Sequence, residues 1–297
     1  MIQKKPGLWG RIALIAATVF WGTSFVILKS SLDSIGILWV LALRFSIASV
    51  ALMLLSRKRL RTMDRKFFKG SVIIGLLLAG AYIVQTYGLK YTTPGKNAFL
   101  TTTYCVLVPF LAWLLFRRRP NLANVLAALL CLVGIGLVSL NSEEAGINIG
   151  DILTLLCGIL YSLQMLSIER YVPGGDALSL STVEFSTAAV ICWIGALLFE
   201  PAPAALSPAL WGSILYMGLI CTALCFFLQA WGMQYTPAST AAVILALEAV
   251  FGALISVLFY GEVMTPRLVL GFTLIFLAVV LSETGPELMK KLHRRRA

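Results

Sequence analysis

The chain has 297 residues, of which 59% are hydrophobic and only 12% are charged, and its formal net charge is +11. Soluble domains usually carry about 25% charged residues, so this composition excludes a water-soluble globular protein. The positive charges stand in short clusters between long apolar runs. This pattern argues against a nucleic-acid-binding domain and is typical of loops that stay in the cytoplasm.

A membrane-spanning helix needs about 20 mostly apolar residues. Windows of that length predict ten spans in chain order, at residues 11–30, 36–56, 68–90, 96–116, 121–140, 149–169, 178–199, 208–231, 237–259 and 265–283. The connections are short, so no soluble domain is expected. With the N-terminus in the cytoplasm, ten spans place most lysines and arginines, and both termini, on the cytoplasmic side. We therefore expect an integral protein of the bacterial cytoplasmic membrane.

The sequence also contains an internal repeat. Residues 85–91 read QTYGLKY and residues 229–235 read QAWGMQY, 144 positions later. Nearer the start of each half the offset is 140, and there Arg44-Phe45 faces Glu184-Phe185. The repeat predicts two halves of five helices, 1–145 and 146–297, the second with a basic C-terminal tail. Because five is odd, the halves enter the membrane from opposite sides, as in many transporters. The predicted fold is an all-α membrane protein with two inverted repeats.

Residue types that usually carry catalysis or metal binding are scarce. All six cysteines lie within apolar segments, without the spacing of a metal site or an extracellular disulfide. The single histidine, His293, lies in the basic tail, and no phosphate-binding loop is present. We expect no enzyme activity, no metal, no cofactor and no direct use of ATP.

Three charged residues lie inside predicted spans, where an ionisable group is costly unless it has a partner or a water-filled cavity. Glu248, near the middle of the ninth span, is the strongest candidate for a functional residue. Its carboxylate would bind an amine or take up a proton. The alternative is a structural hydrogen bond or an ion pair with Arg44. Arg44 and Glu184 occupy equivalent positions of the two repeats, and a structural role is the alternative for both.

Other polar and aromatic residues form a predicted substrate pocket. The fourth span carries Asn97, Thr101 and Tyr104 on one helical face, and the repeat places Tyr104 opposite Glu248. The remaining candidates are in the first, third, sixth and eighth spans: Trp21, Ser24, Tyr82, Gln85, Tyr161, Gln164 and Gln229. Aromatic rings with a few polar groups suit a small-molecule pocket. The alternative is packing and hydrogen bonding between helices.

The order of several short motifs resembles that of the drug/metabolite transporter superfamily, in particular the EamA-type ten-helix permeases. The motifs are Phe20-Trp21-Gly22-Thr23-Ser24-Phe25, Leu43-Arg44-Phe45, Gly88-Leu89-Lys90-Tyr91-Thr92, Leu247-Glu248-Ala249-Val250-Phe251 and Gly261-Glu262-Val263-Met264-Thr265. The family often has a proline after the glutamate of the ninth helix, where this chain has Ala249. A less kinked ninth helix is therefore expected.

The resemblance implies secondary transport, often export, of amino acids, drug-like compounds or other small metabolites. Alternating access follows from the inverted repeat, and proton coupling through Glu248 is a further hypothesis. The expected partners are a small-molecule substrate and membrane lipids, with no nucleic acid. The alternatives are a gated channel, a lipid scramblase or an integral-membrane enzyme acting on lipids.

Overall fold

The computed structural model describes residues 6–139, 148–171, 176–203, 205–235 and 244–296. Within these ranges every regular element is a helix. Nine described helices are long and apolar enough to cross a membrane, and the shorter apolar segment Leu247–Tyr260 occupies the place of the predicted ninth span. The all-α membrane fold is confirmed. The predicted boundary between the halves, at residues 145 and 146, lies outside the described residues.

The first half contains five spans, of which the fourth is divided into two helices. Its elements are α1 (Pro6–Ser31), α2 (Ile37–Leu60), α3 (Arg65–Tyr91), α4 (Pro94–Thr101), α5 (Tyr104–Phe116) and α6 (Leu122–Ser139). The second half follows the same order. Its elements are α7 (Ile149–Tyr171), α8 (Ala177–Phe199), α9 (Pro208–Leu215), the π-helical segment η1 (Tyr216–Leu224), α10 (Cys225–Tyr235), α12 (Leu247–Ile255), the π-helical segment η2 (Ser256–Tyr260) and α13 (Pro266–Arg296).

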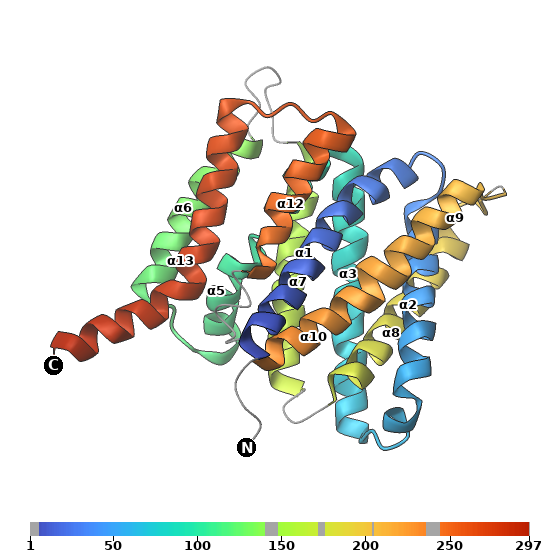
Figure 1. Ribbon diagram of the computed structural model, residues 1–297, viewed down its shortest axis with the longest axis horizontal. Helices are drawn as coiled ribbons and strands as arrows, with labels where there is room; N and C mark the ends of the chain where they lie inside the picture. Colours follow the sequence, from blue (N-terminus) through green and yellow to red (C-terminus); the bar gives the residue numbers. More distant parts are fainter. Residues whose placement is uncertain (1–5, 140–147, 172–175, 204, 236–243, 297) are drawn as a thin grey trace.

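The helices of the two halves pack against each other in a symmetric pattern. Helix α3 lies along α7, and its repeat counterpart α10 lies along α1. Helix α2 pairs with its counterpart α8, and α6 pairs with its counterpart α13 at one edge of the bundle (Figure 1). This exchange of partners is what a twofold relation between inverted repeats requires.

The fourth span breaks near its own middle, where the sequence predicts a continuous helix. Thr102 and Thr103 form a turn between α4 and α5. Their hydroxyls donate to the carbonyls of Phe99 and Leu100, at 2.8 and 2.7 Å. Threonine side chains satisfy local carbonyls in this way and so compete with the helix for hydrogen bonds. The predicted polar face of Asn97, Thr101 and Tyr104 is therefore divided between two helices.

The ninth span breaks at the equivalent position. Ile244 and Leu245 are helical, Ala246 is in a turn, and α12 begins at Leu247. Ala246 lies 144 positions after Thr102. The absence of proline at Ala249 therefore does not leave the ninth helix continuous. Discontinuous helices at matching positions of two repeats are typical of the binding region of transporters.

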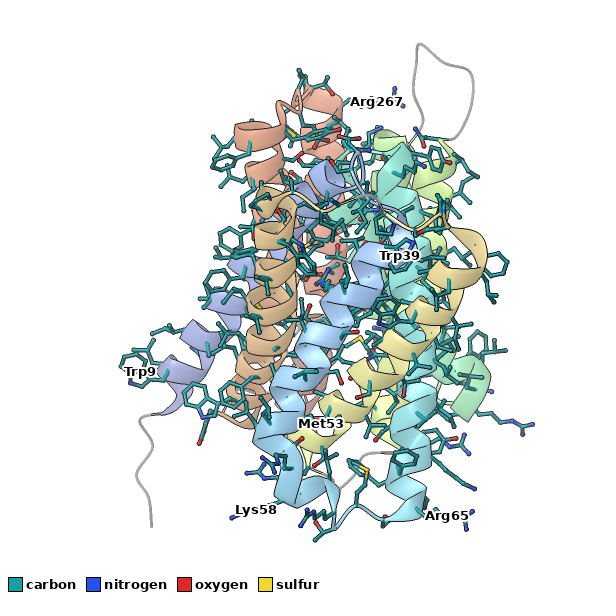
Figure 2. All side chains as sticks on the ribbon, turned by 90° about the vertical axis from the view of Figure 1, so that its right-hand side faces the viewer. Trp9, Trp39, Met53, Lys58, Arg65 and Arg267 are labelled. Atoms are coloured by element: carbon teal, nitrogen blue, oxygen red, sulfur yellow. The ribbon has the colours of Figure 1, made fainter. Side chains whose placement is uncertain are left out.

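The two ends of the bundle differ in charge. The end where α1 begins holds the run from Arg57 to Lys69, which contains seven basic residues. Lys58 and Arg65 mark this end in Figure 2, whereas Trp39 and Arg267 lie near the other end. Helix α13 ends at the same end as α1 begins (Figure 1) and runs to Arg296, past the predicted end of the tenth span at residue 283. We call this end the basic end and the opposite end the far end. We predict that the basic end faces the cytoplasm.

Both ends of the α2–α8 pair are joined by polar contacts. At the far end, the Glu200 carboxylate accepts hydrogen bonds from the backbone amides of Leu38 and Trp39, at 3.0–3.2 Å, and so caps α2. At the basic end, Arg59 contacts Asp176 at 2.6 Å, and Asp176 caps α8 by accepting from the Ser179 amide at 2.9 Å. These caps satisfy amides that a helix leaves without an internal partner.

Candidate functional site

The site lies where the two helix breaks meet the centre of the bundle. Tyr104 is the first residue of α5, and Glu248 stands in the first turn of α12. Glu248 is only 9% exposed. A Cβ atom added to Gly22 of α1 would lie 2.7 Å from the Cβ of Phe251, so only glycine allows α1 to pack this closely on α12. The close contact holds the carboxylate at mid-bundle depth.

A series of aromatic rings crosses the centre with the symmetry of the repeat. Phe45 and Phe185 stack across the middle, with ring centroids 5.9 Å apart and an interplanar angle of 21°. Tyr82 meets Phe45 edge-on at 5.1 Å, and Phe226 meets Phe185 edge-on at 4.8 Å. The two edge-on contacts are repeat equivalents, because Phe226 lies 144 positions after Tyr82.

The next rings on each side are also equivalent. Tyr161 contacts Tyr82 edge-on at 5.7 Å, and Trp21 contacts Phe226 edge-on at 5.4 Å. Trp21 and Tyr161 are the pair that the 140-residue offset predicts. Tyr104 extends the series on one side only, with its centroid 6.1 Å from that of Tyr161. The centre therefore keeps the twofold pattern in its ring contacts, whereas its polar groups differ between the halves.

Arg44 is the most deeply buried basic residue in the described part of the chain, at 1% exposed. Its Nε donates to Oγ1 of Thr222 at 2.7 Å, and its Cζ lies 5.0 Å from the centroid of the Tyr82 ring. Thr222 belongs to η1 and donates in turn to the carbonyl of Met217 at 2.8 Å. Irregular π-helical turns often occur at functional sites.

The ion pair between Arg44 and Glu248 is not formed. Across the described residues, no carboxylate lies within 4.0 Å of the Arg44 guanidinium, and no basic group lies within that distance of Glu248. Arg44 instead lies over the Tyr82 ring, and Tyr82 contacts Tyr161 edge-on. The two opposite charges are therefore buried at the centre without neutralising each other directly.

Glu184, the repeat equivalent of Arg44, has a different environment. It is 2% exposed and accepts a hydrogen bond from Nε2 of Gln164 at 2.7 Å. A Cβ atom on Gly75 would lie 2.7 Å from the Glu184 carbonyl, so α3 packs directly on this part of α8. The structure thus brings together Gln164 and Glu184, which the sequence placed in the same pocket.

Gln85 joins three helices on one side of the site. Its Nε2 donates to Thr101 of α4 at 2.9 Å, and its Oε1 accepts from the Tyr161 hydroxyl of α7 at 3.0 Å. Asn97 donates through Nδ2 to the Gln85 carbonyl at 3.3 Å and to Thr154 of α7 at 2.7 Å. Hydrogen bonds of this kind between transmembrane helices hold a bundle together, so these residues position the tyrosines.

The remaining predicted residues make fewer contacts with the central polar groups. Nε1 of Trp21 donates to the Cys221 carbonyl in η1 at 2.7 Å, and the Ser24 hydroxyl donates back to the Trp21 carbonyl at 2.7 Å. Gln229, the equivalent of Gln85, is half-buried on α10, and its side chain makes no hydrogen bond to the described residues. Ser24 and Gln229 are thus not part of the central polar cluster.

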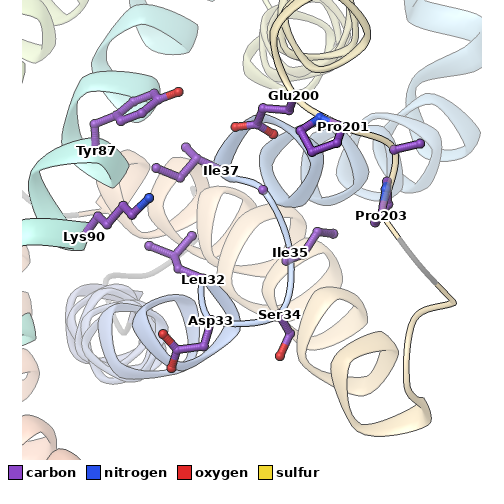
Figure 3. Close-up of a pocket in the computed structure, with 12 residues that line it drawn as sticks. Leu32, Asp33, Ser34, Ile35, Ile37, Tyr87, Lys90, Glu200, Pro201 and Pro203 are labelled. Atoms are coloured by element: carbon purple, nitrogen blue, oxygen red, sulfur yellow. The ribbon is translucent and has the colours of Figure 1, made fainter.

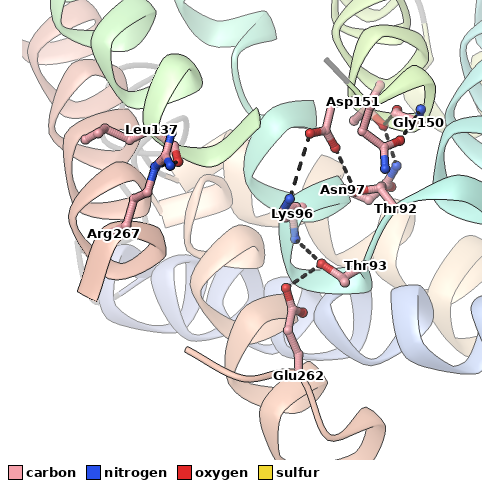
Figure 4. Close-up of polar contacts among 11 residues, drawn as sticks. Thr92, Thr93, Lys96, Asn97, Leu137, Gly150, Asp151, Glu262 and Arg267 are labelled. Atoms are coloured by element: carbon pink, nitrogen blue, oxygen red, sulfur yellow. Dashed lines mark hydrogen bonds and ion pairs between the residues drawn. The ribbon is translucent and has the colours of Figure 1, made fainter. Parts of the chain in front are cut away.

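Residues near the start of α4 form a polar network at the far end of the bundle (Figure 4). The Glu262 carboxylate accepts hydrogen bonds from the Thr93 hydroxyl, from the Gly95 amide at 3.0 Å and from Ser256. Asp151 accepts from Thr92 at 2.7 Å. The network ties the first turn of α4 to α7 and to the α12–α13 connection, and so closes the bundle at this end.

A separate cavity of about 420 Å³ opens at the far end, between the α1–α2 connection and the ends of α3 and α8 (Figure 3). Its lining includes Asp33, Tyr87, Lys90 and Glu200. Glu200 already accepts the free amides of α2, so its carboxylate serves the fold. The sequence prediction did not include this cavity.

Sequence reasoning also missed Thr222 and the central phenylalanines. Thr222 is one hydroxyl in an apolar run, and nothing in that run predicts a π-helical turn. Phe45 and Phe185 carried a signal, because the repeat aligns them beside Arg44 and Glu184.

Comparison with known proteins finds similarity to membrane transporters. The sequence profile of the EamA-like transporter family matches residues 8–140 and again residues 148–284. An uncharacterized transporter of Archaeoglobus fulgidus is 32% identical over 274 residues, which cover 92% of this chain and 85% of that protein. The uncharacterized transporter YwfM of Bacillus subtilis is 25% identical, covering 96% and 97% of the two chains.

Two further similarities are more distant. The biotin transporter of Escherichia coli K12 is 20% identical over 84% of each chain. One crystal structure with 17% identity superposes with a TM-score of 0.68 and covers 92% of this chain and 96% of that one.

Proposed function

Because the chain belongs to the EamA-like transporter family, we propose that this membrane transporter is a secondary carrier that exports small zwitterionic metabolites, such as amino acids, by alternating access. The observation that supports the substrate class is the pair of opposite charges at the centre. Arg44 and Glu248 are both buried, and neither has an ion-pair partner among the described residues.

A zwitterion is complementary to this arrangement. Its carboxylate would bind the Arg44 guanidinium, whose planar donors match a carboxylate. Its ammonium group would bind the Glu248 carboxylate. An apolar or aromatic substituent would pack on the ring series of Tyr82 and Tyr161. Binding in this way neutralises two buried charges, which are costly in a membrane when unpaired.

The substrate class is tested by thermal stability of the purified protein with amino acids, amines, nucleosides, sugars and biotin. A ligand that binds only the folded state adds about 2.7 kcal/mol of stability at one hundred times its dissociation constant. We expect an amino acid to stabilise the wild type and to lose this effect in both Glu248→Gln and Arg44→Lys. Tyr104→Phe should weaken the stabilisation by the amino acid.

Two other outcomes are informative. A response to biotin that survives Glu248→Gln but not Arg44→Lys would replace the zwitterion by a carboxylate-bearing substrate. Amino-acid binding that survives both substitutions would contradict the proposed site.

We also propose that Glu248 couples transport to protons, since its carboxylate lies at the break of the ninth span and makes no ion pair in the described structure. In proteoliposomes, an imposed pH gradient should drive substrate movement by the wild type. Because Glu248→Gln also binds substrate poorly, it should exchange substrate only slowly, and this residual exchange should no longer depend on the gradient. Unchanged gradient-driven transport in Glu248→Gln would show that protons do not use this residue.

A further inference from the structure

An apolar groove lies between two helices of the first half and one helix of the second half. A groove of about 570 Å³ runs between α5, α6 and α7, and its walls include Val106, Phe110, Ala128, Leu132, Ile152 and Leu156. We call it the lateral groove. Leu132 and Leu156 are 64% and 44% exposed although they line it. The groove therefore opens toward the hydrocarbon of the bilayer, where water is absent and only an apolar molecule can fill it.

Two residues of the groove wall are smaller than the residues at the equivalent positions of the second half. At the 144-residue offset, Ala128 corresponds to Phe272 and Leu132 corresponds to Phe276. Phe272 is 6% exposed and stacks on Phe99 with centroids 4.1 Å apart. At these two positions the second half thus carries phenylalanines. The groove therefore does not follow from the repeat.

Arg118 and Arg170 lie at the basic end of the bundle, where two of the helices that line the groove end. Helix α5 ends at Phe116, because Arg117 adopts a left-handed conformation with φ of 58°. The guanidinium carbons of Arg118 and Arg170 lie 5.6 and 5.8 Å from the centroid of the Phe116 ring. Both arginines are exposed. Two guanidinium groups around one ring, at the ends of α5 and α7, form a basic pair at the basic end of the bundle.

The spacing between the groove and the arginine pair fits one lipid molecule. Phe110 in the groove and Phe116 at the pair are six residues apart on α5, which is about 9 Å of helix. The groove continues from Phe110 to Thr103 at the α4–α5 turn, about 20 Å of helix from Phe116. This length is sufficient to cross the hydrocarbon depth of one leaflet, about 15 Å. An acyl chain in the groove would leave its headgroup phosphate beside the guanidinium groups.

We propose that the lateral groove binds one acyl chain of an anionic phospholipid, with the phosphate held by Arg118 and Arg170. Guanidinium groups bind phosphate through paired, charge-assisted hydrogen bonds. The acyl chain would fill space that no side chain occupies. Its tip would lie against Thr103, next to the turn that starts α5 and places Tyr104 in the central site. The bound lipid would therefore stabilise the broken fourth span.

The test is the thermal stability of the full-length protein in detergent with added dioleoyl phosphatidylglycerol or dioleoyl phosphatidylcholine. We expect phosphatidylglycerol to stabilise the wild type at lower concentration than phosphatidylcholine. Arg118→Gln with Arg170→Gln should remove this preference. An arginine near an anionic surface contributes about fivefold, so the pair should contribute roughly thirtyfold in apparent affinity. Arg61→Gln, an exposed arginine at the same end, is the matched control and should keep the preference.

The groove itself is tested by Ala128→Phe, which introduces the residue found at the equivalent position of the second half. It should abolish stabilisation by both lipids. Leu129→Phe, on the neighbouring and 57% exposed position of α6, should leave the lipid effect unchanged. Should Ala128→Phe fail to fold, Leu156→Trp fills the groove from α7. Native mass spectrometry then counts the retained phosphatidylglycerol, with one molecule expected on the wild type and none on the filled variant.

Equal stabilisation of wild type and a folded groove-filling variant would overturn the proposal. So would an unchanged preference for phosphatidylglycerol in the double arginine variant. Loss of the preference in Arg61→Gln as well would show a diffuse attraction of anionic lipid to the basic end and no built site.

Discussion

At the scale of single residues, the centre of the protein is notable for charges that remain unpaired. Burial of an ionised group in a membrane is expensive, and a protein usually offsets it with a directly opposed charge. Arg44 instead has a hydroxyl from Thr222 and the face of the Tyr82 ring. A cation above an aromatic face gains about 2 kcal/mol when desolvated. These contacts hold the guanidinium in place and leave it available to an anionic group.

The hydroxyl of Thr222 should therefore matter for both folding and binding. We predict that Thr222→Val lowers the free energy of unfolding by about 1–3 kcal/mol, because it leaves a buried guanidinium N–H without an acceptor. Substrate affinity should fall as well, since Arg44 loses its fixed orientation. Thr222→Ser keeps the hydroxyl and should behave nearly as the wild type. Thermal unfolding of the three proteins checks this, and equal stability of the valine variant would contradict it.

The sequence predicted which residues lie in the site where the repeat aligned a position or where burial of a charge would be costly. Arg44, Glu184 and Glu248 stand out as charges inside apolar spans, and all three are buried at the centre. Thr222 was not predictable, because its role depends on the π-helical register of η1. The failure of Arg44 and Glu248 to form an ion pair was equally hidden, since sequence spacing does not determine how far apart two side chains on different helices lie.

At the scale of helices, the two breaks and the close packing around them define the site. Gly22 lets α1 approach α12, and Gly252 lets α12 approach Ala98 of α4, where an added Cβ would lie 2.7 Å from the alanine Cβ. Small residues at helix contacts are how transmembrane helices approach closely. The broken helices are therefore clamped between their neighbours on both sides.

This packing predicts a strong position dependence for glycine-to-alanine changes. Gly22→Ala should lower the free energy of unfolding by about 1–3 kcal/mol, because the new methyl group overlaps Phe251. Gly212→Ala is the matched control on α9, where an added Cβ meets nothing within 4 Å. There the change should be neutral or slightly stabilising, since alanine is the better helix former. Similar losses at both positions, measured by thermal unfolding, would contradict the close approach of α1 and α12.

Asp176, which caps α8 at the basic end, predicts that the stability of the protein depends on pH. Burial acts to raise the pKa of Asp176, but hydrogen bonds from the Ser179 hydroxyl and amide and from Arg59 outweigh it and hold the pKa below its usual value of 3.8. A carboxylate with a lowered pKa stabilises the folded state above its unfolded pKa, and this contribution disappears as the pH falls through the folded value.

The difference in thermal stability between wild type and Asp176→Asn should accordingly be constant near neutral pH and shrink once the pH falls below 3.8. Asp64→Asn, at the cap of α3, serves as a comparison for a general effect of cap replacement. A stability difference that grows as the pH falls would show that the charged form of Asp176 does not stabilise α8.

The sequence predicted the helices better than their interruptions. Apolar length alone located the spans, because a bilayer demands about 20 apolar residues whatever the details. The turns at Thr102 and Ala246 lie inside apolar windows and involve no proline or glycine, so hydropathy could not reveal them. Comparing the two halves would have offered one weak clue, since both breaks directly precede the positions of Tyr104 and Glu248 that the repeat aligns.

At the scale of the whole molecule, the two halves share one architecture and differ in chemistry. Symmetric ring contacts at the centre would let the halves exchange conformations, as alternating access requires. The polar groups break the symmetry: Glu262 closes the far end over α4, whereas the repeat-equivalent position at the basic end is Arg118. The inverted repeat was predictable from the sequence, but this division of roles emerged only from the contacts.

The most direct test of the proposed carrier is counterflow in proteoliposomes. Vesicles holding the purified protein are loaded with an unlabelled amino acid that stabilises it and diluted into a trace of the labelled compound at equal pH. An alternating-access carrier predicts a transient accumulation of label above its equilibrium level, because each outward passage of unlabelled substrate returns the site for labelled substrate. Label that only equilibrates, without this overshoot, would indicate a channel and contradict alternating access.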